Sequence, residues 1–457
     1  MNLLVMALAQ GDPLAQLRDG LDTPLLERLV GLLGIAAIIG IAYLISWDRK
    51  SVNWRLVGSG LLLQGAFALI VLRSGPGRWF FQKVGDLANE LLSFSTYGAS
   101  IVFGNLVNSN VPVGVPTPGG VDASGGLVAQ TGAFFAFNVL PTIVFFSALT
   151  TVLYYLGVLQ VVVRGVAWVM QRTLRTSGAE TLSASGNIFI GQTEAPLLVR
   201  PFIDKMTPSE LHTVMTGGFA TVAGGVMAIY ILLLRDYIPS IAGHLIAASV
   251  MNAPAGLLLS KIILPETGKP VTGGSLAINV ERTQSNVIDA AADGASTGAK
   301  LAINIAAMMM AFFALIALLN ALISWGGGLV GLQGLSIEYI IGQAVRPLVW
   351  LMGVPWADTA YVGTLMGVKV VLTELVAYTK LASDLTGGLA AIQPRSMIIA
   401  TYALLGFANL PSIAIQIGGI SGLAPSRRSE LSRLGLKAMI AGNLAAFMSA
   451  CLAGMLA

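Results

Sequence analysis

Two glutamates lie within strongly apolar parts of this sequence, each directly after a threonine. Glu194 is in the segment NIFIGQTEAPLL, and Glu374 is in the segment VLTELV. A carboxylate is costly to place in hydrocarbon, so an ionisable side chain in such a segment indicates a functional site. Carboxylates accept strongly from hydroxyl groups, and an amide such as Gln192 both donates and accepts. This combination suits a neutral solute that is rich in hydroxyl and amide groups.

The composition places these residues in a membrane. Of the 457 residues, 55% are hydrophobic and only 11% are charged, whereas soluble domains carry about 25% charged residues. The net charge of +4 includes no basic tract typical of nucleic-acid binding, and the one cysteine, Cys451, excludes an intramolecular disulfide framework. We therefore predict an all-α polytopic membrane protein with one membrane domain.

Eight segments are candidate membrane spans. They are residues 29–46, 56–73, 134–158, 211–234, 240–264, 299–324, 396–420 and 434–456. Lys and Arg concentrate after the first, third and seventh spans, so the positive-inside rule places those loops in the cytoplasm and both termini outside. Between the second and third spans, residues 77–107 predict a helix along the interface, and the Gly/Pro-rich residues 108–126 predict an exposed loop.

Two further segments begin and end on the same side of the membrane. Residues 179–205 follow a basic loop, carry Glu194 in the middle and return to the basic sequence RPFIDK. Residues 354–384 lie between span six, which ends outside, and span seven, which begins outside. Each is predicted to be a re-entrant helical hairpin, the first opening to the cytoplasm and the second to the exterior. Non-helical backbone at this depth is tolerated only where it lines a cavity or is buried in protein.

The same order of motifs occurs twice along the chain. Thr193-Glu194 in the first hairpin precedes Gly218-Phe219-Ala220-Thr221 in span four, and Thr373-Glu374 in the second hairpin precedes Gly406-Phe407-Ala408-Asn409 in span seven. Because the hairpins enter from opposite faces, the two units form an inverted repeat. Inverted repeats with interrupted transmembrane helices are typical of secondary transporters, which bind their substrate near the midplane.

These assignments divide the chain into four parts. Residues 1–178 hold the N-terminal spans, the interfacial helix and scaffold elements, and residues 179–265 form the first repeat with spans four and five. Residues 266–353 hold a connecting surface helix, span six and an interfacial helix of the scaffold, and residues 354–457 form the second repeat with spans seven and eight.

Several polar residues allow more than one interpretation. Lys369 either neutralises Glu374 in the same hairpin or extends to the interface. Asn187 either caps the inner helix of the first hairpin or, together with Thr221, supplies side-chain oxygens to a cation. Carbonyl groups of kinked backbone at Ile190 and Val222 would complete such a site.

The second repeat leaves two further points open. Phe407 is either core packing or one wall of the substrate site. Pro411 obstructs a continuous helix, which predicts an unwound stretch at residues 407–412.

Four blocks of sequence resemble the concentrative nucleoside transporter family. They are SASGNIFIGQTEAPLLVRPFI, SELHTVMTGGFATVAGGVMAIY, LTELVAY and ALLGFANLPSIAIQIGGI, and they occur in the family's order within a similarity that begins near residue 35. The resemblance implies the bacterial, eight-span type. It also implies a homotrimer in which each protomer carries its own site on a mobile transport part that moves against a scaffold, as an elevator.

The resemblance also implies roles for individual residues. The nucleobase would contact Gln192, Thr193, Glu194 and Val226. The ribose would contact Glu374, Asn409 and Ser412, with Phe407 beside the nucleoside. Sodium would bind Asn187, Thr221 and the backbone of Ile190 and Val222. Many members have a small polar residue where this chain has Pro411.

The sequence therefore predicts a symporter that imports nucleosides across the cell inner membrane, driven by a sodium gradient. It predicts no enzymatic activity and no cofactor, with sodium as the coupling ion. Proton coupling and transport of another small polar solute remain as alternatives, although two acidic residues without an arginine argue against an anionic substrate. An intramembrane hydrolase would lack a clear nucleophile, and two opposed hairpins would make a poor continuous channel.

Overall fold

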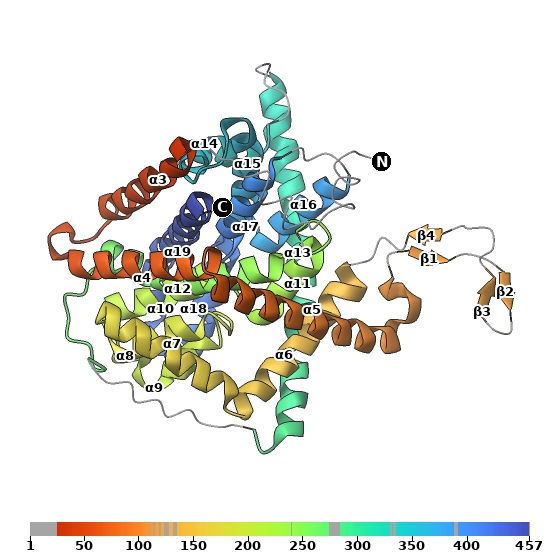
Figure 1. Ribbon diagram of the computed structural model, residues 1–457, viewed down its shortest axis with the longest axis horizontal. Coiled ribbons are helices and arrows are strands. Elements are labelled where there is room, and N and C mark those ends of the chain that lie inside the picture. Colours follow the sequence, from red (N-terminus) through yellow and green to blue (C-terminus); the bar gives the residue numbers. More distant parts are fainter. Residues whose placement is uncertain are drawn as a thin grey trace.

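The computed structural model describes residues 25–108, 110–112, 115–117, 120–122, 128–130, 135–238, 240–273, 284–329, 331, 335–387 and 392–456. Five helices in this part of the chain are long and apolar enough to cross a bilayer. They are Trp54–Leu72, Ala136–Tyr155, Pro208–Leu234, Ile241–Ile263 and Pro425–Leu456. The protein is an all-α polytopic membrane protein, as the composition predicts (Figure 1).

The N-terminal helices follow the predicted order. Helices α3 (Leu25–Leu44) and α4 (Trp54–Leu72) correspond to the first two spans and are joined through η1 (Arg49–Ser51). Helix α5 (Gly75–Phe103), which continues into η2 (Gly104–Val107), is the helix predicted between spans two and three.

Short strands occur within the predicted exposed loop, residues 108–126, and directly after it. Strand β1 (Asn110–Pro112) pairs antiparallel with β4 (Val128–Gln130), and β2 (Val115–Thr117) pairs antiparallel with β3 (Gly120–Asp122). The four strands lie away from the helical body in Figure 1. Each strand is only three residues long and contains a single valine, a residue type that favours strands. Such short strands give no alternating pattern that the sequence analysis could detect among the glycines and prolines.

Two outer helices differ from the prediction. After η3 (Phe135–Val139) and α6 (Leu140–Tyr155), which form span three, a separate helix α7 (Val158–Leu174) follows a turn at Gly157, whose φ is 85°. The sequence analysis missed α7. In the described part of the region predicted to hold a connecting surface helix, α13 (Val287–Leu329) begins early and continues for 43 residues through span six.

The length of α13 has a local cause. Its first half is rich in alanine, the best helix former, and its two early glycines pack against α6 instead of ending the helix. A Cβ atom on Gly298 would lie 2.8 Å from the Cα of Val144, and one on Gly294 would lie 2.7 Å from the Cα of Ala148. Helix α14 (Ile337–Leu351) then follows, at the position of the predicted interfacial helix.

The two repeats have the same order of elements: a hairpin, a broken helix and a long helix. In the first repeat the elements are α8 (Gly178–Gly186), η4 (Ala195–Val199), α9 (Arg200–Ile203), α10 (Pro208–Ala220), α11 (Gly224–Leu234) and α12 (Ile241–Ile263). In the second repeat they are η5 (Trp356–Asp358), α15 (Thr359–Val371), α16 (Glu374–Thr386), α17 (Pro394–Leu404), α18 (Leu410–Leu423), η6 (Pro425–Arg427) and α19 (Arg428–Leu456).

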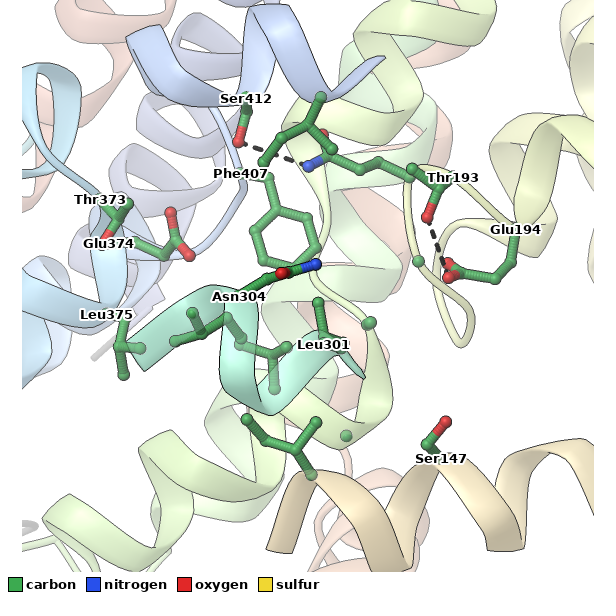
Figure 2. A pocket seen from close by; sticks show the side chains of 18 of the residues that line it. Ser147, Thr193, Glu194, Leu301, Asn304, Thr373, Glu374, Leu375, Phe407 and Ser412 are labelled. Carbon is green, nitrogen blue, oxygen red and sulfur yellow. Dashed lines mark hydrogen bonds between the residues drawn. The ribbon is translucent and has the colours of Figure 1, made fainter. Parts of the chain in front are cut away.

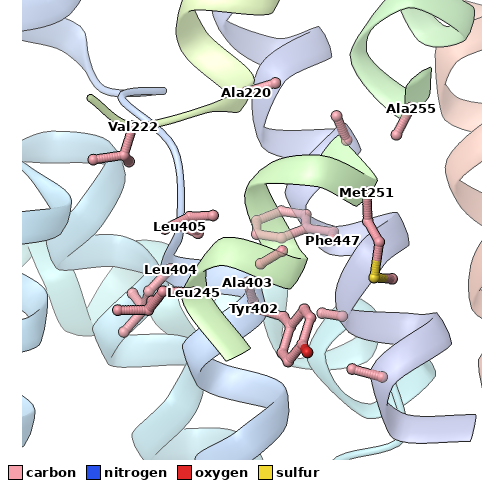
Figure 3. Close-up of a cluster of buried hydrophobic side chains, with 14 of the residues drawn as sticks. Ala220, Val222, Leu245, Met251, Ala255, Tyr402, Ala403, Leu404, Leu405 and Phe447 are labelled. Carbon is pink, nitrogen blue, oxygen red and sulfur yellow. The ribbon is translucent and has the colours of Figure 1, made fainter. Parts of the chain in front are cut away.

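The repeats form the interior of the protein. The apolar windows of α12 and of the span that contains α19 are 89% and 78% buried, whereas those of α4 and of the span that contains α6 are only 33% and 22% buried. Figure 3 shows Met251 of α12, Tyr402 of α17 and Phe447 of α19 in one buried apolar cluster. The outer helices therefore expose apolar surface, and the repeats pack against each other.

A buried ionic network holds the base of the first hairpin. The Nζ of Lys261 on α12 lies 2.7 Å from Glu180 Oε2 on α8 and 3.2 Å from Glu266 Oε2. The hydroxyl of Ser177, which caps α8, donates to Glu210 Oε1 at the start of α10 (2.5 Å). These contacts join α8, α10 and α12 into one unit.

Replacing Lys261 by Met should destabilise the protein by about 3–5 kcal/mol, because Glu180 would be left buried without its cation. Thermal unfolding in detergent, followed by tryptophan fluorescence, measures the effect. The control is Lys83→Met, which removes an ion pair to Asp86 whose side chains are 62% and 60% exposed and should change stability by less than about 1 kcal/mol. Equal effects of the two substitutions would contradict the structural role of the network.

Candidate functional site

The two broken helices meet at their unwound segments. The N–H of Phe407 donates to the carbonyl of Thr221 (3.2 Å). A backbone N–H at the break of the second repeat is thus paired with a backbone carbonyl at the break of the first. Asn252 of α12 donates from Nδ2 to the carbonyl of Ala220 (2.7 Å), and Asn443 of α19 donates in the same way to Ala408 (2.8 Å). Ala220 and Ala408 are the alanines of the two Gly-Phe-Ala motifs. The repeat therefore includes a third pair, Asn252 and Asn443, which the sequence analysis missed.

Gly406 is required at this meeting point by both its conformation and its surroundings. Its φ is 115°, and a Cβ atom there would lie 2.7 Å from the carbonyl oxygen of Phe219 and 2.9 Å from that of Ala220. L-residues rarely adopt this φ, so only glycine lets the two segments approach so closely.

The unwound stretch in span seven is shifted from its predicted position. Helix α17 ends at Leu404 and α18 begins at Leu410, so residues 405–409 are unwound, and the prediction of 407–412 is wrong at both ends. Pro411 lies in the first turn of α18. Proline is favoured there because an N–H in the first turn has no helical partner to lose.

Glu374 is buried and receives two hydrogen bonds. Tyr230 of α11 donates from Oη to Glu374 Oε1 (2.8 Å), and Asn409 donates from Nδ2 to Glu374 Oε2 (2.8 Å). Asn409 also caps α18, because its Oδ1 accepts from the N–H of Ser412 (2.9 Å). The sequence analysis missed Tyr230, whose ring stacks on Tyr378 at a centroid distance of 4.3 Å.

Lys369 does not extend to the interface, and it makes no close ion pair with Glu374 among the described residues. The side chain is fully buried. Its Nζ donates to the carbonyl groups of Ala403 (2.9 Å) and Leu405 (3.3 Å). Lys369 therefore satisfies carbonyls at the end of α17, where the helix breaks.

The tip of the first hairpin contacts the second repeat. Gln192 donates from Nε2 to Ser412 Oγ (3.3 Å), and its Oε1 accepts from Gln416 Nε2 (3.0 Å). Thr193 donates from Oγ1 to Glu194 Oε1 (2.9 Å), and the Glu194 side chain is exposed. The polar groups at this tip are thus placed partly by their neighbours and partly by α18.

Both hairpin tips and both breaks line one cavity of about 610 Å³, a volume typical of small-molecule sites. In Figure 2, Phe407 lies between Glu374 on one side and Thr193 and Glu194 on the other. All eight residues that the sequence analysis assigned to substrate line this cavity: Gln192, Thr193, Glu194, Val226, Glu374, Phe407, Asn409 and Ser412. Phe407 is half-buried and forms part of the wall.

The outer helices α6 and α13 also line the cavity. They contribute polar side chains that the sequence analysis did not single out: Ser147, Thr150, Thr151, Thr297 and Asn304. Because these helices lie outside both repeats, no repeat motif pointed to them.

Asn187 has an oxygen that suits a cation. The residue is buried at the end of α8, where its Nδ2 donates to the carbonyl of Ser183 (3.1 Å). Its Oδ1 is buried and has no hydrogen-bond partner among the described residues. Capping and cation binding, which the sequence left as alternatives, are therefore compatible in this residue.

The other three proposed cation ligands lie close to this helix end in the fold. Thr221 donates its hydroxyl proton to Gly217 (2.9 Å), and the oxygen keeps lone pairs for a cation. A Cβ atom on Gly217 would lie 3.2 Å from Asn187 Nδ2, which places Asn187 against α10 one turn before Thr221. The N–H of Gly224 donates to Phe189 (3.1 Å), which holds the backbone around Ile190 near Val222. Neutral oxygens of this kind fit a hard monovalent cation.

Two re-entrant hairpins and two broken helices around a central cavity define the secondary-transporter class. Three family models match the chain: "Na+ dependent nucleoside transporter N-terminus" at residues 33–106, "Nucleoside recognition" at 136–236 and "Na+ dependent nucleoside transporter C-terminus" at 244–454. The uncharacterized transporter YutK of Bacillus subtilis is 43% identical over 93% of this chain and 99% of its own length. The chain belongs to the Na+ dependent nucleoside transporter family.

Other relatives agree with this assignment. Sodium/nucleoside cotransporter 1 of Mus musculus is 41% identical over 94% of this chain, although the chain spans only 64% of that protein's length. The structure of CNTnw in an inward-facing substrate-bound state is 42% identical, with a TM-score of 0.81 over 94% of this chain and 97% of that chain. A CNTnw variant in an outward-facing state gives 42% identity and a TM-score of 0.83 over 95% and 98% of the two chains.

Gly406→Ala should lower stability by more than about 2 kcal/mol, because the added methyl group meets two carbonyl oxygens and φ is unfavourable for alanine. Thermal unfolding in detergent measures the loss. Gly418→Ala on α18 is the matched control, since a Cβ atom there has no neighbour within 4 Å and alanine favours helix. If Gly406→Ala melted at the temperature of the unchanged protein, the close approach of the two breaks would be incorrect.

Proposed function

We propose that the protein imports nucleosides across the cell inner membrane, driven by a sodium gradient. The observation that carries this proposal is the convergence of both hairpin tips and both helix breaks on one cavity, where polar groups from the two repeats face each other. Family membership supports the same conclusion, since the matching models are those of sodium-dependent nucleoside transporters.

The cavity offers different chemistry on its two sides. The Glu374 side, with Asn409 and Ser412, would bind the ribose. A carboxylate has about four lone-pair sites. Tyr230 and Asn409 occupy one on each Glu374 oxygen, so at most two remain to accept from sugar hydroxyls. The nucleobase would contact the opposite side, formed by the residues Gln192, Thr193, Glu194 and Val226. Phe407, between the two sides, would pack against the nucleoside.

Sodium would couple to substrate through the first hairpin. Its ligands would be the side chains of Asn187 and Thr221 and the backbone of Ile190 and Val222. The sodium ligands on the hairpin, Asn187 and Ile190, come shortly before Gln192 in the sequence. A bound ion would therefore order the tip that contacts the base and lower the conformational cost of binding nucleoside. By linkage, nucleoside would raise sodium affinity by the same factor.

The remaining expectations form part of the same proposal. The exposed apolar faces of the outer helices and the buried repeats fit a division into a scaffold and a mobile transport part, which would move as an elevator. We also propose a homotrimer with one site in each protomer, and both termini outside the membrane. The scaffold would hold residues 1–178 and 266–353, and the transport part residues 179–265 and 354–457.

Uptake into proteoliposomes reconstituted with the purified protein tests the function directly. An inward sodium gradient should drive accumulation of labelled uridine, while a potassium gradient of the same size should not. Asn187→Ala should abolish the sodium dependence, because it removes the free Oδ1; Asn53→Ala, which alters the exposed cap of α4, should leave it unchanged. Accumulation that follows a proton gradient and ignores sodium would replace sodium by protons as the coupling ion.

Glu374→Gln should weaken uridine binding by about 1–3 kcal/mol, because a charged acceptor for the sugar hydroxyls is lost. Isothermal titration with uridine and 3′-deoxyuridine measures the effect. The variant should lose more affinity for uridine than for the deoxy analogue, which already lacks one hydroxyl. Unchanged affinity for both ligands would remove Glu374 from the ribose site.

A further inference from the structure

Gln416 on α18 is a fully buried glutamine outside the cavity wall, and the proposed function gives it no role. Its Nε2 makes two hydrogen bonds: one to the carbonyl of Met215 on α10 (3.1 Å) and one to Gln192 Oε1 at the tip of the first hairpin (3.0 Å). Gln416 therefore connects a backbone group to a residue that lines the cavity.

These contacts decide which way the Gln192 amide faces. The oxygen and the NH₂ group of a side-chain amide have nearly the same shape, so hydrogen-bond partners determine which of the two faces a given neighbour. The Met215 carbonyl only accepts, so the part of Gln416 that faces it must be the NH₂ group. The same NH₂ group faces Gln192, so Gln192 must present its oxygen to Gln416. Consequently the Gln192 nitrogen lies on the opposite side, toward Ser412 Oγ (3.3 Å), which lines the cavity.

The two glutamine side chains pack directly against Gly218, so a side chain at position 218 would collide with both. A Cβ atom on Gly218 would lie 2.8 Å from Gln416 Nε2 and 2.9 Å from Gln192 Cβ. Gly218 belongs to the first Gly-Phe-Ala motif, so the motif that forms the break also provides the space for the two glutamines.

We propose that Gln416 is a positioning residue that holds Gln192 as a hydrogen-bond donor toward the nucleobase and thereby favours bases with a carbonyl group over bases with an amino group at the same edge. This inference rests on the proposed function, since it requires Gln192 to face the base. The NH₂ group of Gln192 has two protons. One is directed to Ser412, and the second remains for an acceptor on the base.

The preference follows from hydrogen-bond pairing. A 4-oxo pyrimidine or 6-oxo purine accepts from Gln192, whereas a 4-amino or 6-amino group would place a donor against a donor. Gln192 can accept from an amino group only by reversing its amide. Its NH₂ group would then face the NH₂ group of Gln416, and the bond between the two glutamines would be lost.

The test compares ligands that differ in this one group. Isothermal titration with uridine and cytidine, and with inosine and adenosine, should give the unchanged protein at least about fivefold higher affinity for the oxo member of each pair, the effect of one net hydrogen bond of about 1 kcal/mol. Gln416→Met keeps the volume but frees the Gln192 amide to reverse. Both ratios should then fall to within about twofold.

Gln64→Met provides the matched control. Gln64 on α4 is also fully buried, and its Nε2 donates to Ser449 Oγ on α19 (2.9 Å), but it does not line the cavity. The substitution removes a buried amide and its hydrogen bond, as Gln416→Met does. The affinity ratios should remain those of the unchanged protein, because a general loss of stability does not distinguish an oxo from an amino group.

A second variant keeps the inference testable if Gln416→Met does not fold. Gln192→Met removes the donor itself and should abolish both preferences, and adding Gln416→Met to it should change the ratios no further. The inference is overturned if the unchanged protein shows no oxo preference, or if the preference survives in either single variant. Absence of any nucleoside binding by the unchanged protein would instead overturn the proposed function and this inference with it.

Discussion

A helix that breaks inside a membrane must find partners for its free backbone groups within the protein, because the hydrocarbon offers none. This structure meets that requirement twice and in the same way. Asn252 binds the carbonyl of Ala220, and Asn443 binds that of Ala408, in each case from the long helix that follows the break. The bond from Phe407 to Thr221 then joins the two breaks to each other. The remaining features of the site depend on this junction.

The junction explains why the cavity contains groups from both repeats. Since the breaks lie against each other, the hairpin that precedes each break brings its tip to the same place. Gln192 of the first hairpin forms hydrogen bonds with Ser412 and Gln416 of the second repeat. Glu374 of the second hairpin accepts a hydrogen bond from Tyr230 of the first repeat. Each repeat therefore orients polar groups of the other, and a change in their relative position alters the site as a whole.

The sequence predicted much of this site because its signals are local. A carboxylate within an apolar segment is visible without any structure, and so are the repeated Thr-Glu and Gly-Phe-Ala motifs. The resemblance to a known family added the assignment of individual residues to the cavity. In contrast, Tyr230 and Gln416 carry no local signal. Their partners are 144 and 224 residues away along the chain, so only the folded protein shows that they orient Glu374 and Gln192.

The sequence by itself determined the class of protein, the order of hairpin and broken helix in each repeat and the position of the two breaks to within a few residues, because composition, apolar length and glycine placement act over short distances. The tertiary structure decided which partner each buried polar group has. Lys369 donates to the carbonyls at the end of α17, and Pro411 lies in the first turn of a helix that it was expected to interrupt. The place of Pro411 has a local reason, because the first turn of a helix needs no N–H from it. The Lys369 contacts depend on which carbonyls the break leaves unpaired, and Ala403 and Leu405 lie 34 and 36 residues away along the chain, so only the packing of distant segments brings these groups together.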